Sequence, residues 1–284
     1  MKKILVTFLF LVVAICNCAF AMQITMLDVG QGDSILIDTG SEKILIDTSQ
    51  NRERYEFYLS GVIVDKLILS HPHADHIALA ANIIKNNGVN AVYDNGQPST
   101  SRHYLNYMKA IKAQNINRYK LAAGDRIYLS GGAYLDCLSP DLFSKSVNDN
   151  SLVLKLVFNN FSMLFTGDIS AEQESYLAEN ADLRANILKA AHHGSKYSNS
   201  LDFIKAVNPE YVLISAGAGY GHPHAAALDN FLIAGVAKSN ILCTKNNGAI
   251  TITTDGESYS VEGENSAAWL DNYLGYRLSI TKIN

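Results

Sequence analysis

The chain has 284 residues, of which 48% are hydrophobic and only five are proline, so it can bury a large core in one domain or two closely packed halves. Its formal net charge of −4 argues against a basic surface that would hold a nucleic-acid backbone through a general electrostatic field. Any phosphate-containing substrate would therefore have to be held locally, by metal.

The first 21 residues are typical of a secretory signal peptide. Two lysines precede an apolar run over residues 4–15, and Ala19 and Ala21 are small residues at the positions that a signal peptidase reads. The apolar run is shorter than the ~20 residues of a membrane-spanning helix, which argues against an uncleaved anchor. The sequence therefore predicts an exported protein, periplasmic or extracellular, that begins at residue 22.

Two cysteines, Cys137 and Cys243, remain after this cleavage. An exported protein can join two cysteines in a disulfide, but thiols so far apart in a large domain can equally be buried and free. The sequence leaves both alternatives open.

The mature chain opens with strands and then alternates strands with helices. Residues 23–28 alternate as a strand does, and the identical runs 35–39 and 44–48 flank a short polar turn, which predicts a β-hairpin. Further strands are expected at 64–70, 89–94, 125–138, 151–158, 161–165, 185–190, 210–215 and between 241 and 261, with helices at 76–87, 101–115, 170–180, 200–207 and 225–235. This order predicts an α/β (α+β) fold of mixed sheets with helices packed outside them. We expect one domain over 22–262 and a C-terminal appendage over 263–284.

Seven of the eight histidines fall into three tight groups, and the first follows the strand expected at 64–70. It contains His71, His73, Asp75 and His76. Two imidazoles separated by one residue in an extended loop can converge on one ion, while Asp75 and His76 face a neighbouring position. Neutral imidazole is the commonest metal ligand near neutral pH. The motif therefore predicts ligands for two metal ions.

Asp168 ends the run Phe165-Thr-Gly-Asp168, at the end of a hydrophobic strand. By itself, an aspartate here would cap the following helix by accepting backbone N–H bonds. The histidine motif reverses this preference, because a carboxylate can bridge two cations. We therefore expect Asp168 to lie between the two metal positions.

The other two histidine groups also follow strands. His192 and His193 cannot both be core residues, because successive side chains leave a strand on opposite sides. One is expected to bind metal and the other to donate a proton or hydrogen bond to substrate, and the sequence leaves open which is which. His222 lies in the glycine-rich run 217–224, which fits a loop against a bound anion and equally a surface turn.

These motifs in this order resemble the metallo-β-lactamase superfamily. Within it, the runs 28–34, 148–154, 192–195 and 221–223 are similar to the branch that includes ComEC-type competence proteins, and the resemblance covers about residues 23–254. It implies an αββα sandwich, in which two mixed β-sheets are flanked by helices and the metals lie at one edge of both sheets.

The resemblance also implies roles for individual residues. His71 and His73 would bind one zinc ion, Asp75 and His76 would bind a second, and Asp168 would bridge them. His193, with His192 as the alternative, would complete the second position. Asp47 would orient a ligand histidine without itself binding the metal, and Asp33, in the Gly-Gln-Gly-Asp turn, would play a supporting part. The expected catalytic side chains are Asp75, His192 and His222.

One departure concerns the first zinc position. Many superfamily members supply a third histidine from a loop before the Gly-Asp motif, and this interval contains only His103, in an expected helix. The run Asn148-Asp-Asn-Ser151 occupies that place. We therefore expect two Zn²⁺ ions, the first of them weakly held.

The implied function is zinc-dependent hydrolysis by a metal-bound hydroxide, because zinc lowers the pKa of water from 15.7 to about 7. A phosphoester substrate such as nucleic acid fits two cations best, which makes a phosphodiesterase or nuclease-like enzyme the main expectation. The alternatives are a phosphorylcholine esterase or another small-ester or lactam hydrolase, and then a non-catalytic, zinc-stabilised binding protein. The sequence gives no evidence of a transmembrane partner and leaves the oligomeric state open.

Overall fold

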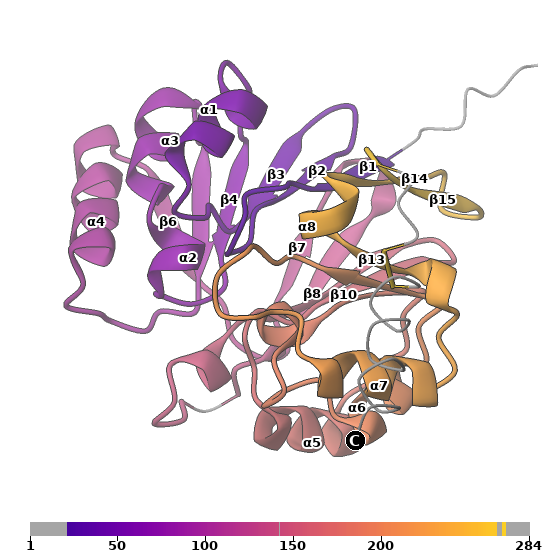
Figure 1. Ribbon diagram of the computed structural model, residues 1–284. Helices are drawn as coiled ribbons and strands as arrows, with labels where there is room; N and C mark the ends of the chain where they lie inside the picture. Colours follow the sequence, from indigo (N-terminus) through magenta and orange to yellow (C-terminus); the bar gives the residue numbers. More distant parts are fainter. Residues whose placement is uncertain (1–21, 142, 266–268, 271–284) are drawn as a thin grey trace, which may run out of the picture.

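The computed structural model describes residues 22–141, 143–265 and 269–270. They form a four-layered αββα sandwich, in which two β-sheets pack face to face and helices cover the outer face of each (Figure 1). The predicted architecture is therefore confirmed. The predicted signal peptide, residues 1–21, lies outside the described residues.

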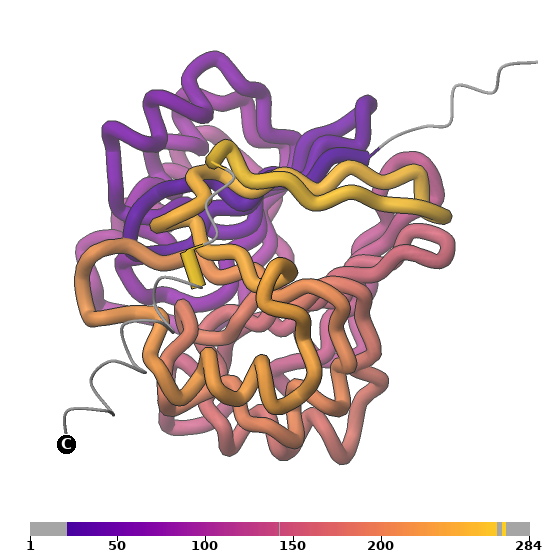
Figure 2. Tube along the Cα trace, turned by 45° about the vertical axis from the view of Figure 1, so that its right-hand side comes forward, coloured from indigo at the N-terminus to yellow at the C-terminus, as the bar shows by residue number. Residues whose placement is uncertain are grey.

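The first sheet has eight strands in the order β15-β14-β1-β2-β3-β4-β5-β6. Its strands are β1 (Met22–Met26), β2 (Ile35–Asp38), β3 (Lys43–Ile46), β4 (Lys66–Leu69), β5 (Ala91–Asp94), β6 (Asn117–Lys120), β14 (Ile250–Thr254) and β15 (Tyr259–Gly263). Strands β3 to β6 run parallel, whereas β1 pairs antiparallel with both β2 and β14. The hairpin of β14 and β15 thus lies along β1 (Figure 2).

The second sheet has seven strands in the order β13-β12-β11-β10-β9-β8-β7. Its strands are β7 (Arg126–Tyr128), β8 (Tyr134–Ser139), β9 (Val153–Phe158), β10 (Phe161–Phe165), β11 (Ile187–Lys189), β12 (Tyr211–Ile214) and β13 (Ile241–Cys243). The predicted hairpin between β9 and β10 is present, and β10 to β13 run parallel. The inner faces of the two sheets share one apolar core, built mainly from isoleucine, leucine, methionine and phenylalanine side chains.

Helices cover the outer faces in two groups. The first sheet carries α1 (Arg52–Leu59), α2 (Ala74–Ile77), α3 (Ala80–Asn86) and α4 (Arg102–Gln114), and the second carries α5 (Ala171–Asn180), α6 (Leu201–Val207) and α7 (Ala225–Ile233). A short α8 (Thr244–Asn247) follows β13. Of the helices formed by described residues, none is both long enough and apolar enough to cross a membrane.

Some local predictions were wrong. The single helix expected at 76–87 is two helices, α2 and α3, and the first of them begins within the histidine motif. Helix α1 and the edge strand β6 were not predicted, because the sequence of each lacks a clear apolar period: β6 is Asn117-Arg-Tyr-Lys120, a polar edge strand.

Parallel strands bring the predicted site residues together. The carboxyl ends of β3 and β4 in one sheet, and of β10, β11 and β12 in the other, meet at the same edge of the sandwich. Every site residue after a strand in the sequence therefore lies at this edge. This is the position at which α/β sheets usually bind ligands.

The two cysteines of the described residues are buried and free. Cys137 lies in β8 and Cys243 in β13, five strands apart in the same sheet, which is about 24 Å at the usual spacing of strands. A disulfide requires Cα atoms within about 7 Å. The structure therefore resolves the open alternative in favour of free thiols.

We expect two reactive thiols per chain when the protein beginning at residue 22 is denatured without a reductant. Burial raises the pKa of both Cys137 and Cys243 to about 12, so neither thiol is expected to react in the native protein. Counting thiols with a chromogenic disulfide reagent, with and without denaturant, measures both expectations. Fewer than two thiols after denaturation would indicate an oxidised pair.

A candidate metal centre at the edge of the sandwich

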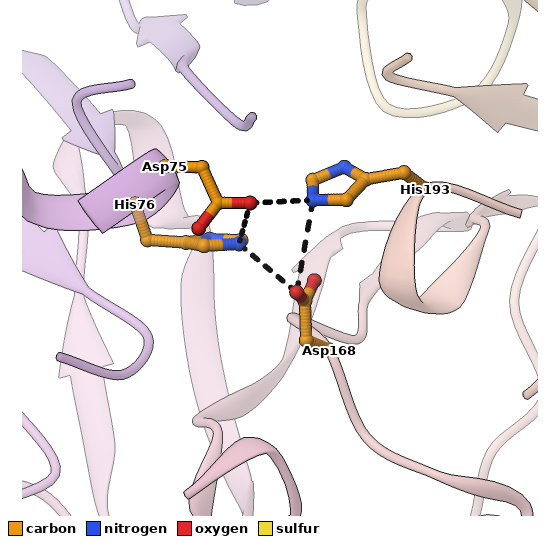
Figure 3. A group of neighbouring side chains, drawn as sticks. All are labelled: Asp75, His76, Asp168 and His193. Carbon is orange, nitrogen blue, oxygen red and sulfur yellow. Dashed lines mark ion pairs between the residues drawn. The ribbon is translucent and has the colours of Figure 1, made fainter. Parts of the chain in front are cut away.

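Four side chains from both sheets converge at this edge. Asp75 and His76 come from α2, Asp168 follows β10, and His193 follows β11 (Figure 3). One ligand atom from each lies within 4.8 Å of the others, and His76, Asp168 and His193 are fully buried. The sequence predicted all four of these residues as metal ligands, and the fold brings them together.

Three of the separations within this group are close to those of ligands around one small cation, and a fourth, from His76 Nε2 to Asp75 Oδ2, is 4.0 Å. His76 Nε2 lies 3.2 Å from Asp168 Oδ2, and His193 Nε2 lies 3.4 Å from Asp75 Oδ2 and 3.6 Å from Asp168 Oδ2. Four tetrahedral ligands at 2.0–2.1 Å from an ion lie about 3.3 Å apart. The group therefore needs little rearrangement to hold a metal.

Three histidines share one hydrogen-bonding arrangement. His76 Nδ1 donates to Asp47 Oδ2 at 2.7 Å, His193 Nδ1 donates to the Ser215 carbonyl oxygen at 2.9 Å, and His71 Nδ1 lies 3.0 Å from Ser70 Oγ. Within the described part of the chain, the Nε2 atoms of all three are buried without a hydrogen-bond partner. In a metal-binding histidine, one ring nitrogen is typically held by a hydrogen bond and the other is buried without a protein partner.

Asp47 and Ser70 link the rings of His71 and His76 through hydrogen bonds. Asp47 accepts hydrogen bonds from the backbone N–H and the hydroxyl of Ser70, both at 2.7 Å, in addition to the one from His76. Because the Ser70 hydroxyl donates to Asp47, its oxygen accepts from His71 Nδ1. Ser151 Oγ lies 3.2 Å from the same nitrogen and accepts from the Asp168 backbone N–H at 3.1 Å.

His71 and His73 lie beside the four-residue group. His71 is fully buried, and its Nε2 is 3.9 Å from Asp168 Oδ2, so the same carboxylate oxygen faces both His71 and His76. His73 is exposed, with its ring centroid 4.8 Å from that of His71. His103, the only histidine between the first motif and Asp168, is exposed on α4, and Ser151 contacts His71.

A buried ion pair lies behind the centre. Lys189, the last residue of β11, is 1% exposed and pairs with Asp33, and its ammonium also donates to the Gly167 carbonyl oxygen at 3.0 Å. Asp33 Oδ1 lies 3.4 Å from His193 Nδ1. Sequence reasoning gave Asp33 a supporting role but overlooked Lys189, although a lysine inside an apolar parallel strand is a sign of a buried partner.

The turn that contains Asp33 also positions Asp75. Gly32 has a φ of +126°, and a Cβ there would collide with the Asp75 carbonyl group. The close approach lets the Asp33 backbone N–H donate to that carbonyl oxygen at 3.2 Å. Glycine is therefore required at residue 32 both by its backbone angles and by the contact.

The electrostatics of the centre show where positive charge is needed. Burial opposes ionisation, but Asp168 and Asp47 together hold the pKa of His76 well above its usual value, and Asp168 and Asp33 raise that of His193 to about 9. Burial also opposes the charge of Asp168, yet these histidines hold its pKa well below the usual range. Protons on His76 and His193 thus balance the carboxylates, and a bound cation would replace them.

His192 and His222 lie at the open side of the centre. The His192 side chain is 29% exposed, and its Nε2 is 3.8 Å from Asp168 Oδ2, outside the four-residue group. The ring centroid of His222 is 5.9 Å from that of His192 and 6.0 Å from that of His193. Burial lowers the pKa of His192, and burial with the neighbouring His193 and His224 lowers that of His222 to about 4, so both rings are neutral at neutral pH.

Known proteins are similar to this chain in sequence or in fold. Residues 27–128 match the family described as "Metallo-beta-lactamase superfamily". The chain is 29% identical to ComE operon protein 3 of Bacillus subtilis over 72% of this chain and 30% of that protein, and 30% identical to competence protein ComA of Neisseria gonorrhoeae over 80% of this chain and 31% of that protein. It therefore spans less than a third of the length of either relative.

Among solved structures, the metallo-β-lactamase fold protein YhfI of Bacillus subtilis superposes with a TM-score of 0.60. The alignment covers 82% of this chain and 99% of that protein, at 13% identity. This likeness concerns the fold, whereas the competence proteins share the sequence as well. The chain therefore has the metallo-β-lactamase fold, matches that superfamily in sequence over residues 27–128, and resembles one part of the competence proteins.

Proposed function

We propose that the protein is an exported, zinc-dependent phosphodiesterase that acts on nucleic acid. The observation that carries this proposal is the position of the Asp168 carboxylate, whose Oδ2 lies 3.9 Å from His71 Nε2 and also faces His76 and His193 of the four-residue group. It provides for two adjacent cation positions, and paired cations suit an in-line displacement at phosphorus. The relatives named for competence favour a nucleic-acid substrate.

Each position would be held by residues that the chain has already oriented. Asp75, His76 and His193 would bind one zinc ion and His71 and His73 the other, with Asp168 shared between them. Nitrogen and oxygen ligands of this kind suit zinc. The first position is expected to be the weaker, because Ser151 stands where a third histidine would be and His73 is exposed.

Bound zinc ions would lower the pKa of water and neutralise charge on the phosphoryl oxygens. Side chains of the protein would bind the substrate oxygens and accept the proton of the attacking water. His192, neutral and partly exposed beside Asp168, would donate a hydrogen bond to the leaving oxygen, and His222 would donate one to a non-bridging oxygen. Asp75, 26% exposed at the opening of the centre, would hold its zinc ion and accept a proton from the attacking water.

The signal peptide predicted for residues 1–21 would make this a periplasmic or extracellular enzyme. A phosphorylcholine ester, another small ester or a lactam remains the alternative substrate, because the same two cations could polarise these bonds too. A zinc-stabilised binding protein without activity is disfavoured because it would have no need of a shared aspartate, Asp168, beside the adjacent pair His192 and His193.

Substrate choice can be tested with the purified chain from residue 22, loaded with zinc. We expect cleavage of single-stranded DNA and of bis(p-nitrophenyl) phosphate, and little or no turnover of p-nitrophenyl phosphorylcholine or a chromogenic cephalosporin. The variant that carries both His71→Ala and His73→Ala is the control and should lose at least ~100-fold in rate, because it removes an entire cation position. Turnover of the cephalosporin alone would contradict the proposal.

A further inference from the structure

Two loops from different sheets meet at the open side of the centre. The first connects β1 to β2 and contains Gln31, and the second follows β12 and contains Gly217 and His222. A Cβ at Gly217 would collide with the backbone of Gly30 and Gln31, at separations that real Cβ atoms do not reach. Because residue 217 has no side chain, the backbone of the second loop can pack directly against the backbone of the first.

The side chain of Gln31 joins the loops through both ends of its amide group. Its Oε1 accepts a hydrogen bond from the Gly217 backbone N–H at 3.4 Å, and its Nε2 lies 3.2 Å from His222 Nδ1. A backbone N–H can only donate, so the amide oxygen must face Gly217 and the amide NH₂ must face His222.

This orientation decides where the proton of His222 lies. An amide NH₂ group can only donate, so Nδ1 of the ring must accept, and a neutral ring then carries its single proton on Nε2. No hydrogen bond within the described residues involves Nε2 of His222. The ring is 7% exposed and lies about as close to His192 as to His193.

We propose that Gln31 is a positioning residue that holds His222 in the Nε2–H tautomer, so that His222 presents a fixed hydrogen-bond donor to an anionic oxygen of the substrate. A donor that is fixed in advance stabilises charge in the transition state without having to reorient. The opposite tautomer would place a lone pair toward the same oxygen and repel it. The role of the donor rests on the proposed function, whereas the tautomer does not.

The tautomer can be read directly from the ring ¹⁵N shifts of the full mature chain, without any substrate. The His222 signals are assigned by their loss in His222→Gln, and the spectrum is recorded with and without zinc. We expect the proton on Nε2 in the wild type. Gln31→Glu replaces the donor with a carboxylate that can only accept, so His222 should then carry a proton on Nδ1. An unprotonated Nδ1 in Gln31→Glu would overturn the proposal.

Two glycines of the same loop provide a matched pair for the contact between the loops. Gly217→Ala should separate the loops and weaken the preference for the Nε2–H tautomer. Gly219→Ala should leave the tautomer unchanged, because a Cβ at residue 219 meets nothing within 4 Å. Equal spectra for the two variants would show that the contact does not position His222.

Kinetics test the role of the donor. With bis(p-nitrophenyl) phosphate, Gln31→Ala should lower kcat by about tenfold or more, with a smaller change in KM and with the zinc content of the wild type. A kcat equal to that of the wild type would overturn the donor role of His222. If the wild type cleaves no phosphodiester at all, the proposed function fails, and the ¹⁵N spectra still decide whether Gln31 sets the tautomer.

Discussion

Replacing His193 with alanine is expected to release the metal from the four-residue group, whereas replacing its neighbour His192 should leave the metal bound. The His193 Nε2 atom is buried without a partner and faces both Asp75 and Asp168, while its Nδ1 is held by a carbonyl oxygen. Loss of a partner behind a ligand typically weakens binding by about 10–100-fold. Loss of the ligand itself should therefore weaken zinc binding by more than ~100-fold.

His192→Ala is the matched control, since it removes the same group one residue away. It should keep the zinc affinity of the wild type and lower kcat, by about 10²–10⁴-fold if His192 exchanges a proton with the leaving group. Competition with a chromophoric chelator measures the affinities, and phosphodiester hydrolysis measures kcat. Loss of zinc from His192→Ala but not from His193→Ala would reverse the assignment of the two histidines.

Replacing Lys189 with methionine is expected to cost about 3–5 kcal/mol of the free energy of unfolding, because it leaves the Asp33 carboxylate buried without its cation. Methionine keeps the apolar length of the lysine side chain, so the charge is the main change. Urea unfolding of the metal-free protein measures the effect and separates it from zinc binding.

The double variant Lys189→Met with Asp33→Asn is the control, because it removes both charges together. It should recover most of the lost stability, as replacing a whole buried pair is often nearly neutral. Burial opposes the charge of Asp33, but Lys189 and His193 hold its pKa below the usual value. The stabilisation from the pair is thus present above about pH 4 and is lost as the pH falls further. A single variant as stable as the wild type would show that Lys189 is not needed to compensate Asp33.

The strand patterns predicted mixed sheets with helices outside them, and the resemblance to the metallo-β-lactamase superfamily implied their arrangement as an αββα sandwich. The repeated run Ile-Leu-Ile-Asp-Thr marked the hairpin of β2 and β3, and Asn159-Asn160 marked the turn between β9 and β10. Predictions failed where the pattern was polar or where helices were short. Strand β6 and helix α1 show no clear apolar period, and the break between α2 and α3 lies at Ala78 and Leu79, two residues that favour helix.

Several features of the site depend on side chains that meet across the two sheets. The contact of Ser151 with His71, the pairing of Lys189 with Asp33 and the amide of Gln31 between Gly217 and His222 each join residues far apart in the chain. Hydrogen-bonding geometry of this kind has no local signature in a sequence. The left-handed backbone angles of His192 and His193, with φ of 50° and 56°, likewise could not be predicted from the apolar periodicity of the sequence.

The sequence by itself determined which kinds of residue would gather at the site, because each motif ends a strand and parallel strands bring their carboxyl ends to one edge. Only the tertiary structure decided which nitrogen of each histidine is free and that His193 rather than His192 joins Asp75, His76 and Asp168. The physical reason is that a side chain can bind the metal only if the lone pair of its ligand atom points at the ion. Neighbouring ligand atoms here lie only 3–4 Å apart, so small changes in direction decide which side chain binds. Those directions are set by partners such as Asp47 and the Ser215 carbonyl group, which reach the site only when the sheets have packed.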